Sequence, residues 1–183
     1  MPVKNLRHLP KAHLHLHLEG AMRPATLTEF CARYKIERPS DTRGQQFSNF
    51  TAFNEVYRAA SDSIRTKQDL ARVILEVAED AAKDGANWIE LAFDADRYTI
   101  LRADRSLRLF ETPYEGWLFV LEAARNASEK TGVGISFISA IDRTRPIEQA
   151  NERAKLTTNL ISSQKHQITA KNINGGEPYA GII

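Results

Sequence analysis

The chain has 183 residues, a hydrophobic share of 42%, a charged share of 26% and a formal net charge of +2. These values are ordinary for a globular chain with one core, and the scattered Arg and Lys residues indicate neither a nucleic-acid nor a membrane partner. The lone Cys31 excludes a disulfide within the chain and is typical of a reducing compartment. No segment approaches the roughly 20 apolar residues of a membrane span, so we expect a cytoplasmic protein.

Hydrophobic patterns predict three or four short strands. Residues 13–18 alternate histidine with leucine, whereas Val133 to Ile141 is almost continuously apolar, as strands buried on both faces are. Two registers are open for a fourth strand towards the end of the chain. The expected strands therefore cover residues 11–18, 88–93, 133–141 and either 179–183 or 167–174.

Helix start signals lie between these strands. Thr66 opens a capping box with Asp69, and Gly85 follows as a helix-ending glycine. Prolines also mark helix starts, since proline fits the first turn of a helix. The expected helix starts are Pro24, Thr66, Pro113 and Pro146, with a further helix over the aromatic stripe Phe50, Phe53, Tyr57, Ala60 and Ile64.

Apolar stripes at helical spacing indicate which helix faces are buried. We expect the aromatic stripe after Phe50 to be core packing. The helix after Pro146 is expected to bury one side, which consists of Ile147, Ala150, Ala154, Leu160 and Ile161.

Strands that alternate with helices predict an α/β fold with parallel strands and right-handed crossovers. The simplest architecture is a partial (β/α)8 TIM barrel, comprising the first three to four β/α units with extra helices after strand one. A whole barrel typically needs about 250 residues. We therefore expect residues 1–183 to form a single incomplete barrel domain, truncated before its second half. The open barrel edges of such a domain favour self-association.

The first predicted strand carries the most informative residues. With strict alternation, His13, His15, His17 and Glu19 share one face and the leucines share the other. Imidazoles two residues apart can lean together and reach one metal at about 2.0–2.1 Å. A half-exposed strand that happens to be rich in histidine is the alternative. The carboxylate and Gly20 at its end favour a metal site, because barrel sites gather at the carboxyl ends of strands.

These residues resemble the opening of the adenosine deaminase family, a zinc branch of the amidohydrolase superfamily. Its first barrel strand reads Pro-Lys-x-x-Leu-His-x-His-Leu-(Asp/Glu)-Gly, followed by a helix entered at a Pro-x-Thr step. The chain has PKAHLHLHLEG from Pro10 to Gly20, and then Pro24-Ala25-Thr26. The resemblance is close over residues 9–30 and colinear to about residue 162.

Two departures from the family pattern bear on the substrate. His13 stands where glutamate is usual, and Glu19 stands where aspartate is commoner in the best-known adenosine-specific members. Both leave open a different substrate within the superfamily.

The resemblance implies a function and a cofactor. His15 and His17 would be two ligands of a Zn²⁺ ion, and Glu19 would contact the sugar hydroxyl of a purine nucleoside. A zinc-bound water has a pKa near 7 and attacks as hydroxide, so the amino group leaves as ammonia. The expected reaction is zinc-dependent hydrolytic deamination of a 6-aminopurine nucleoside, adenosine to inosine, by the full-length parent.

The family's other catalytic parts are absent from this sequence. They are a His-Ala-Gly-Glu run, a further histidine and an Asp-Asp pair. None of the histidines stands in a His-x-x-Glu context, and the chain has no Asp-Asp pair. We therefore expect no catalytic residue here and no activity from these 183 residues alone. The histidines are His8, His13, His15, His17 and His166.

Other polar residues are weaker candidates for a functional site. Asp94 and Asp142 follow predicted strands and are either substitute ligands or caps of the next segment, the more usual role. Glu90 is expected to pair with a basic side chain in the barrel interior, and His166 to lie at the surface.

Two alternatives to an adenosine deaminase remain at this stage. One is a related hydrolase of the same superfamily that acts on another aminated purine nucleoside or a cyclic amide. The other is a non-catalytic, truncated, metal-binding fragment.

Overall fold

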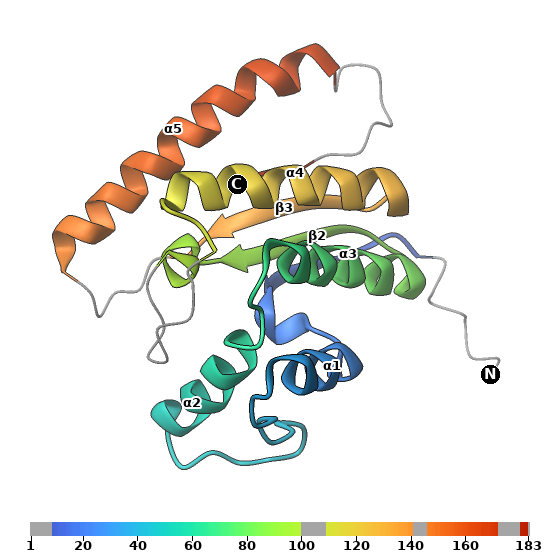
Figure 1. Ribbon diagram of the computed structural model, residues 1–183. Helices are drawn as coiled ribbons and strands as arrows, with labels where there is room; N and C mark the ends of the chain where they lie inside the picture. The colour runs from blue at the N-terminus through green and yellow to red at the C-terminus, as the bar shows by residue number, and fades with distance from the viewer. Residues whose placement is uncertain (1–8, 100–108, 141–145, 172–179, 183) are drawn as a thin grey trace.

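The sheet at the centre of the molecule is parallel. The computed structural model describes residues 9–99, 109–140, 146–171 and 180–182. Within that part the strand order is β1-β2-β3-β4, so each strand pairs with the next one along the sequence. This is the order of consecutive units in a barrel, and it confirms the predicted α/β fold. The strands are β1 (Lys11–His17), β2 (Ala86–Phe93), β3 (Gly134–Ser139) and β4 (Ala180–Ile182) (Figure 1).

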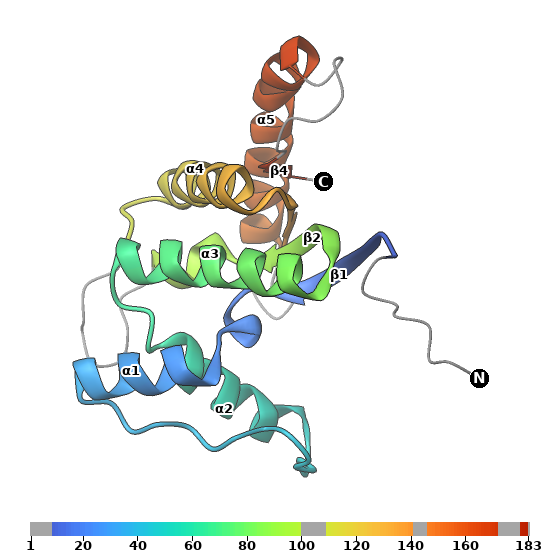
Figure 2. The same ribbon diagram turned by 90° about the vertical axis from the view of Figure 1, so that its right-hand side faces the viewer.

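Helices cover one face of this sheet and extend from its ends. Both views show α3 and α4 side by side along the strands, with α1 and α2 beyond β1 and α5 on the opposite side (Figures 1 and 2). The two extra helices after the first strand are those predicted. The bounds are η2 (Glu19–Ala21), α1 (Pro24–Tyr34), α2 (Phe50–Ser61), α3 (Lys67–Asp84), η3 (Ala95–Tyr98), α4 (Pro113–Thr131) and α5 (Ile147–Lys171).

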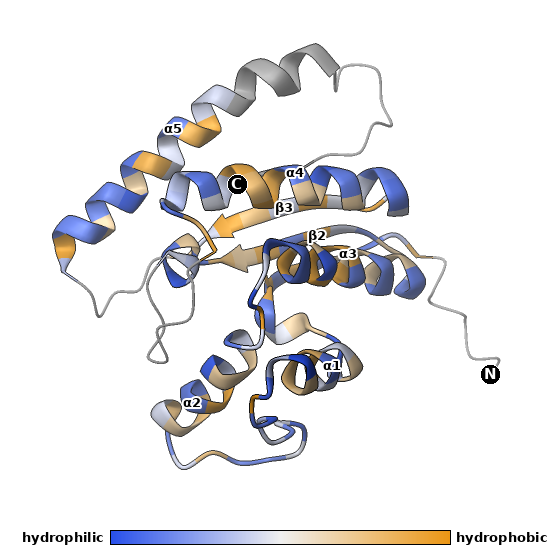
Figure 3. Cartoon of the chain, viewed as in Figure 1, coloured by the Kyte–Doolittle hydropathy of each residue, from blue (hydrophilic) through white to orange (hydrophobic). Residues whose placement is uncertain are grey.

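The core lies between the sheet and the helices α3 and α4. Phe93 at the end of β2 meets the Trp117 ring of α4 edge-on, with 5.1 Å between ring centroids, and Trp117 meets Phe137 of β3 at 5.8 Å. The hydrophobic colours of β2 and β3 continue into the facing sides of these helices (Figure 3). Burial of this apolar surface is the main stabilising contribution to the fold.

Local signals place most helix ends correctly. The Thr66 side chain accepts from the Asp69 amide and the Asp69 side chain accepts from the Thr66 amide, which confirms the capping box. Thr112 caps α4 in the same way by accepting from the amide of Glu115. Gly85 follows α3 in a left-handed conformation at φ 84°, where a side chain would be strained.

A bulge in β1 breaks the expected alternation. His13 pairs with Ile89 and Leu16 pairs with Leu91, so β1 advances three residues where β2 advances two. His15 lies in this step with φ 58°, a left-handed conformation that is uncommon outside glycine. Leu14 is consequently 62% exposed, and the prediction that all the leucines share a buried face is wrong.

Two predictions of core packing are confirmed only in part, because Ile64 and Leu160 are buried but other residues of the same stripes are exposed. In α2, Phe50 is 76% exposed and Phe53 is 38% exposed, because this helix lies beyond the end of the sheet and not over it. In α5, Ile147 and Ala154 are exposed, whereas Leu160 is buried. The fourth strand takes the later of the two registers, since residues 167–171 continue α5. No helix in the described part is long and apolar enough to cross a membrane.

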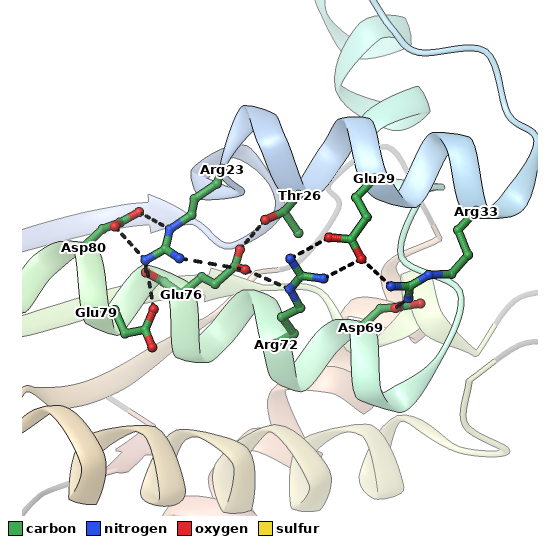
Figure 4. Close-up of polar contacts among 9 residues, drawn as sticks. All are labelled: Arg23, Thr26, Glu29, Arg33, Asp69, Arg72, Glu76, Glu79 and Asp80. Carbon is green, nitrogen blue, oxygen red and sulfur yellow. Dashed lines mark hydrogen bonds and ion pairs between the residues drawn. The ribbon is translucent and has the colours of Figure 1, made fainter.

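Polar contacts join α1 to α3 (Figure 4). Arg23 donates to both carboxylate oxygens of Asp80 at 2.9 and 2.8 Å and to Glu79 at 2.9 Å. Further along, Arg72 bridges Glu29 and Glu76 at 2.8 Å each. The contacts continue to the buried end of the interface, where Arg33 reaches Asp69 at 2.8 Å.

The buried Asp69 carboxylate is the best-satisfied group of this interface. Besides capping α3, it accepts from Arg33 and from the Tyr34 hydroxyl, while its side chain is only 2% exposed. We expect Asp69→Ala to lower the free energy of unfolding by about 3 kcal/mol, because it leaves buried donors without an acceptor. Urea unfolding followed by circular dichroism measures this change.

Asp80→Ala is the matched control. Its side chain is 51% exposed and its partner Arg23 keeps Glu79, so the expected loss is below about 1 kcal/mol. Equal losses for the two variants would contradict the assignment of Asp69 as the principal anchor.

Candidate active site at the carboxyl end of β1

His15 and His17 lie side by side at the end of β1. Their ring centroids are 5.5 Å apart and the ring planes are tilted by 28°. Both residues are exposed, and His17 pairs in register with Ala92 of β2. The two imidazoles therefore stand next to each other at the carboxyl edge of the sheet, where they can share one ligand.

His13 is separated from them by the bulge. Its Nε2 atom lies 3.2 Å from Oδ2 of Asp84, at the carboxyl end of α3, and Lys11 lies 3.4 Å from the same oxygen. The His13 hydrogen bond and the Lys11 charge hold the pKa of Asp84 below its usual value. The prediction that all three histidines share one face with Glu19 is wrong, because the extra residue turns His13 towards the helix.

Glu19 follows directly in the single turn η2 and is buried, with 4% of its surface exposed. The Tyr57 hydroxyl of α2 donates to its Oε2 at 2.6 Å, and the Tyr98 hydroxyl of η3 donates to its Oε1 at 2.7 Å. Burial and the Glu19 carboxylate raise the pKa of both tyrosines above their usual value. Both phenols therefore stay protonated and donate to Glu19 near neutral pH.

Tyr57 connects this carboxylate to the histidines. Its ring meets the His17 ring edge-on at 6.0 Å between centroids. The Arg97 guanidinium lies over the Tyr57 ring, 5.3 Å from its centroid, and donates to Ser61 at 3.3 Å. These contacts hold α2 beside the end of β1.

The segment after β2 supplies several of these groups. Asp94 accepts from the Asp96 amide at 3.0 Å and so caps η3, as strand-end aspartates usually do. Asp96 is buried and pairs with Arg153 of α5, whose Nε donates at 2.6 Å. This places η3 between the candidate site and α5.

The remaining predicted candidates are Glu90, Asp142 and His166. No hydrogen bond or ion pair joins Glu90 to a basic residue in the part of the chain that the structure describes, so the predicted pairing is not formed there. Asp142 lies outside the described residues, as does the His166 side chain.

Sequence reasoning missed Tyr57, Tyr98 and Arg97. Tyr57 lies on a stripe that was interpreted as core. Arg97 and Tyr98 lie shortly after the second strand. Their position at the carboxyl end of a strand is the signal that could have marked them as site residues.

A metal at this edge would find two imidazole ligands. Among the described residues, no three His, Cys, Asp or Glu side chains lie close enough together to hold a metal ion. A catalytic zinc usually takes about three protein ligands and keeps one open position. The donor chemistry of His15 and His17 suits zinc, and the pair would supply two of the ligands that such a set needs.

Comparison with known proteins gives the family and the fold of the chain. The sequence profile of adenosine deaminase matches residues 10–181. The chain belongs to the adenosine deaminase family. A putative adenosine/adenine deaminase of Streptomyces virginiae is 31% identical over 161 residues, which cover 84% of this chain and 45% of that protein. An adenosine deaminase of Clostridium acetobutylicum is 26% identical, over 92% of this chain and 50% of that protein. The family member described here thus spans about half the length of these relatives.

Solved structures show the same fold. An adenine deaminase from Arthrobacter aurescens superposes with a TM-score of 0.58 at 24% identity, over 95% of this chain and 48% of that chain. An amidohydrolase from Burkholderia ambifaria, solved with bound Zn, gives 0.60 at 22% identity over 97% and 45%. These TIM-barrel proteins confirm that the described sheet corresponds to part of a barrel.

The Glu19 cluster generates a stability prediction for this family member. Tyr98→Phe removes a donor from a carboxylate oxygen in a site where both residues are buried. We expect the free energy of unfolding to fall by about 2 kcal/mol, as measured by urea denaturation. The control Tyr114→Phe changes a half-exposed tyrosine of α4 and is expected to stay within about 0.5 kcal/mol of the wild type. Identical stabilities for both variants would show that the Tyr98 hydroxyl does not hold Glu19.

Proposed function

We propose that this chain contributes to the zinc-dependent hydrolytic deamination of a 6-aminopurine. The observation that carries the proposal is the contact between the His15 and His17 rings, 5.5 Å apart at the carboxyl end of β1. Membership of the adenosine deaminase family supports the reaction type. In this reaction water adds at the ring carbon that carries the amino group, the carbon–nitrogen bond breaks, and ammonia leaves.

His15 and His17 would hold the zinc ion. The chemistry that zinc supplies when bound is activation of a water for attack near neutral pH. Their exposed rings offer nitrogen donors, while Glu19 and Tyr57 form a fixed wall on one side of them. We propose that residues 1–183 supply these groups to one barrel domain, and that the proton-donating carboxyl is supplied from elsewhere.

Zinc binding tests the assignment of the two histidines. We expect His15→Ala and His17→Ala each to weaken zinc binding by at least about 10–100-fold, since each removes a direct ligand and even outer-shell changes cost this much. Competition with a chromophoric chelator measures the affinity without any need for activity.

His13→Ala is the matched control for this experiment. His13 belongs to the same strand, but it contacts Asp84 and not the other two histidines. Zinc affinity should therefore stay within about twofold of the wild type. Loss of zinc in this variant, or its retention in the other two, would argue against the proposed ligands.

Activity tests the reaction itself. We expect the zinc-loaded chain of residues 1–183 to release no ammonia from adenine or adenosine, because its sequence holds no His-Ala-Gly-Glu run and no Asp-Asp pair. A longer protein that carries these residues together with both motifs would be expected to release ammonia from a 6-aminopurine and to lose this activity in His15→Ala. An ammonia assay on both proteins, with the zinc-free forms as blanks, decides between the outcomes.

A further inference from the structure

The two histidines at the end of β1 present their rings to solvent. His15 and His17 are both exposed, and their ring centroids lie 5.5 Å apart with the planes tilted by 28°. Tyr57 contacts the His17 ring at 6.0 Å between centroids. Within the described residues, neither imidazole takes part in a hydrogen bond or an ion pair. The ring nitrogens are therefore open to a ligand that comes from outside the chain.

The metal site that this pair begins is incomplete within one copy of the chain. No group of three His, Cys, Asp or Glu side chains that could hold a metal ion occurs among the residues that the structure describes. His13 is held away by Asp84, at 3.2 Å. Glu19 is 4% exposed, and its oxygens accept from Tyr57 and Tyr98. One copy thus offers two of the four ligands of a tetrahedral zinc.

A second copy of the chain offers the other two ligands. A two-fold axis brings the same surface of both copies together, so it places two pairs of imidazoles opposite each other. In the described sheet β1 is an edge strand, which pairs with β2 alone. Leu14, next to His15, is 62% exposed, and contact between copies would remove it from water. The net charge of +2 gives only a weak repulsion between copies.

We propose that zinc joins two copies of this chain, with His15 and His17 of each copy as its four ligands. This inference rests on the zinc assignment in the proposed function and names the partner that completes the site. Imidazole nitrogens suit zinc, and four protein ligands make a closed site of the structural kind, which keeps no open position for water. The joined copies are therefore expected to release no ammonia from adenine or adenosine.

The experiment uses the purified chain of residues 1–183 with zinc as the only added ligand. Light scattering after size exclusion measures the mass, which is 20.6 kDa for a single chain. The metal-free chain is expected to be single, and half an equivalent of zinc should double its mass. Zinc analysis of the doubled species should give one ion for two chains, and a chelator should restore the single chain.

Three results would overturn this inference, and they separate it from the proposed function. One zinc ion per chain without a change in mass would leave the zinc assignment of the two histidines standing. A doubled mass in the presence of the chelator would show that the copies pair without zinc. A chain that binds no zinc would overturn this inference and the zinc ligands of the proposed function together.

Variants test which side chains hold the two copies together. His17→Ala and His15→Asn each remove two of the four ligands from the joined pair, so zinc-dependent pairing should weaken by at least about 100-fold. Asparagine is chosen at position 15 because it tolerates the left-handed conformation found there, φ 58°, better than most residues. Circular dichroism identifies a variant that does not fold, and the other variant then decides.

His13→Ala is again the matched control, since this histidine of the same strand contacts Asp84. Its zinc-dependent pairing should stay within about twofold of the wild type. Pairing that survives in a folded His17→Ala or His15→Asn variant, or that is lost in the control, would overturn the assignment of the four ligands.

Discussion

The extra residue in β1 is the constraint on which the candidate site depends. In a strand, a shift of one residue exchanges the two faces for every position that follows. Between His13 and Leu16 the chain makes this shift once, through the left-handed conformation of His15. Residues before it direct polar groups to the helix side, while Leu16 after it returns to the core. The pair of His15 and His17 is thereby left at the carboxyl edge of the sheet. The left-handed residue persists there only because the pairing on both sides fixes it.

Glu19 then determines what gathers around that edge. A buried carboxylate is unfavourable unless hydrogen-bond donors compensate the loss of water. Here the donors come from two elements distant in sequence, Tyr57 of α2 and Tyr98 of η3. Because the buried Glu19 carboxylate needs these donors, it holds α2 and η3 at the end of β1. This explains how α2 is held in place although much of its aromatic surface is exposed.

Local signals in the sequence predicted much of the fold and only part of the site. Thr66 and Pro24 mark helix starts through contacts within four residues, and such contacts do not depend on tertiary structure. The turn of His13 towards Asp84 could not be predicted, because it depends on pairing with a strand more than 70 residues away. Phe50 was interpreted as core for a similar reason, since a helical stripe indicates a face without saying what covers it.

Contacts on both sides of η2 also help to fix the position of Glu19. On one side of η2, the amide of Leu18 donates to the carbonyl of Ala92 at 3.2 Å, which ties the chain to β2. On the other side, Arg23 is held to α3 by Asp80 at 2.8 Å. The segment between these two anchors is short, so Glu19 has little freedom to move towards a ligand. The hydrogen-bond donors must therefore be brought to this carboxylate, as the hydroxyls of Tyr57 and Tyr98 are. The ionic contact of Arg23 with α3 thus helps to fix Glu19 at the strand ends, although Asp80 is half-exposed.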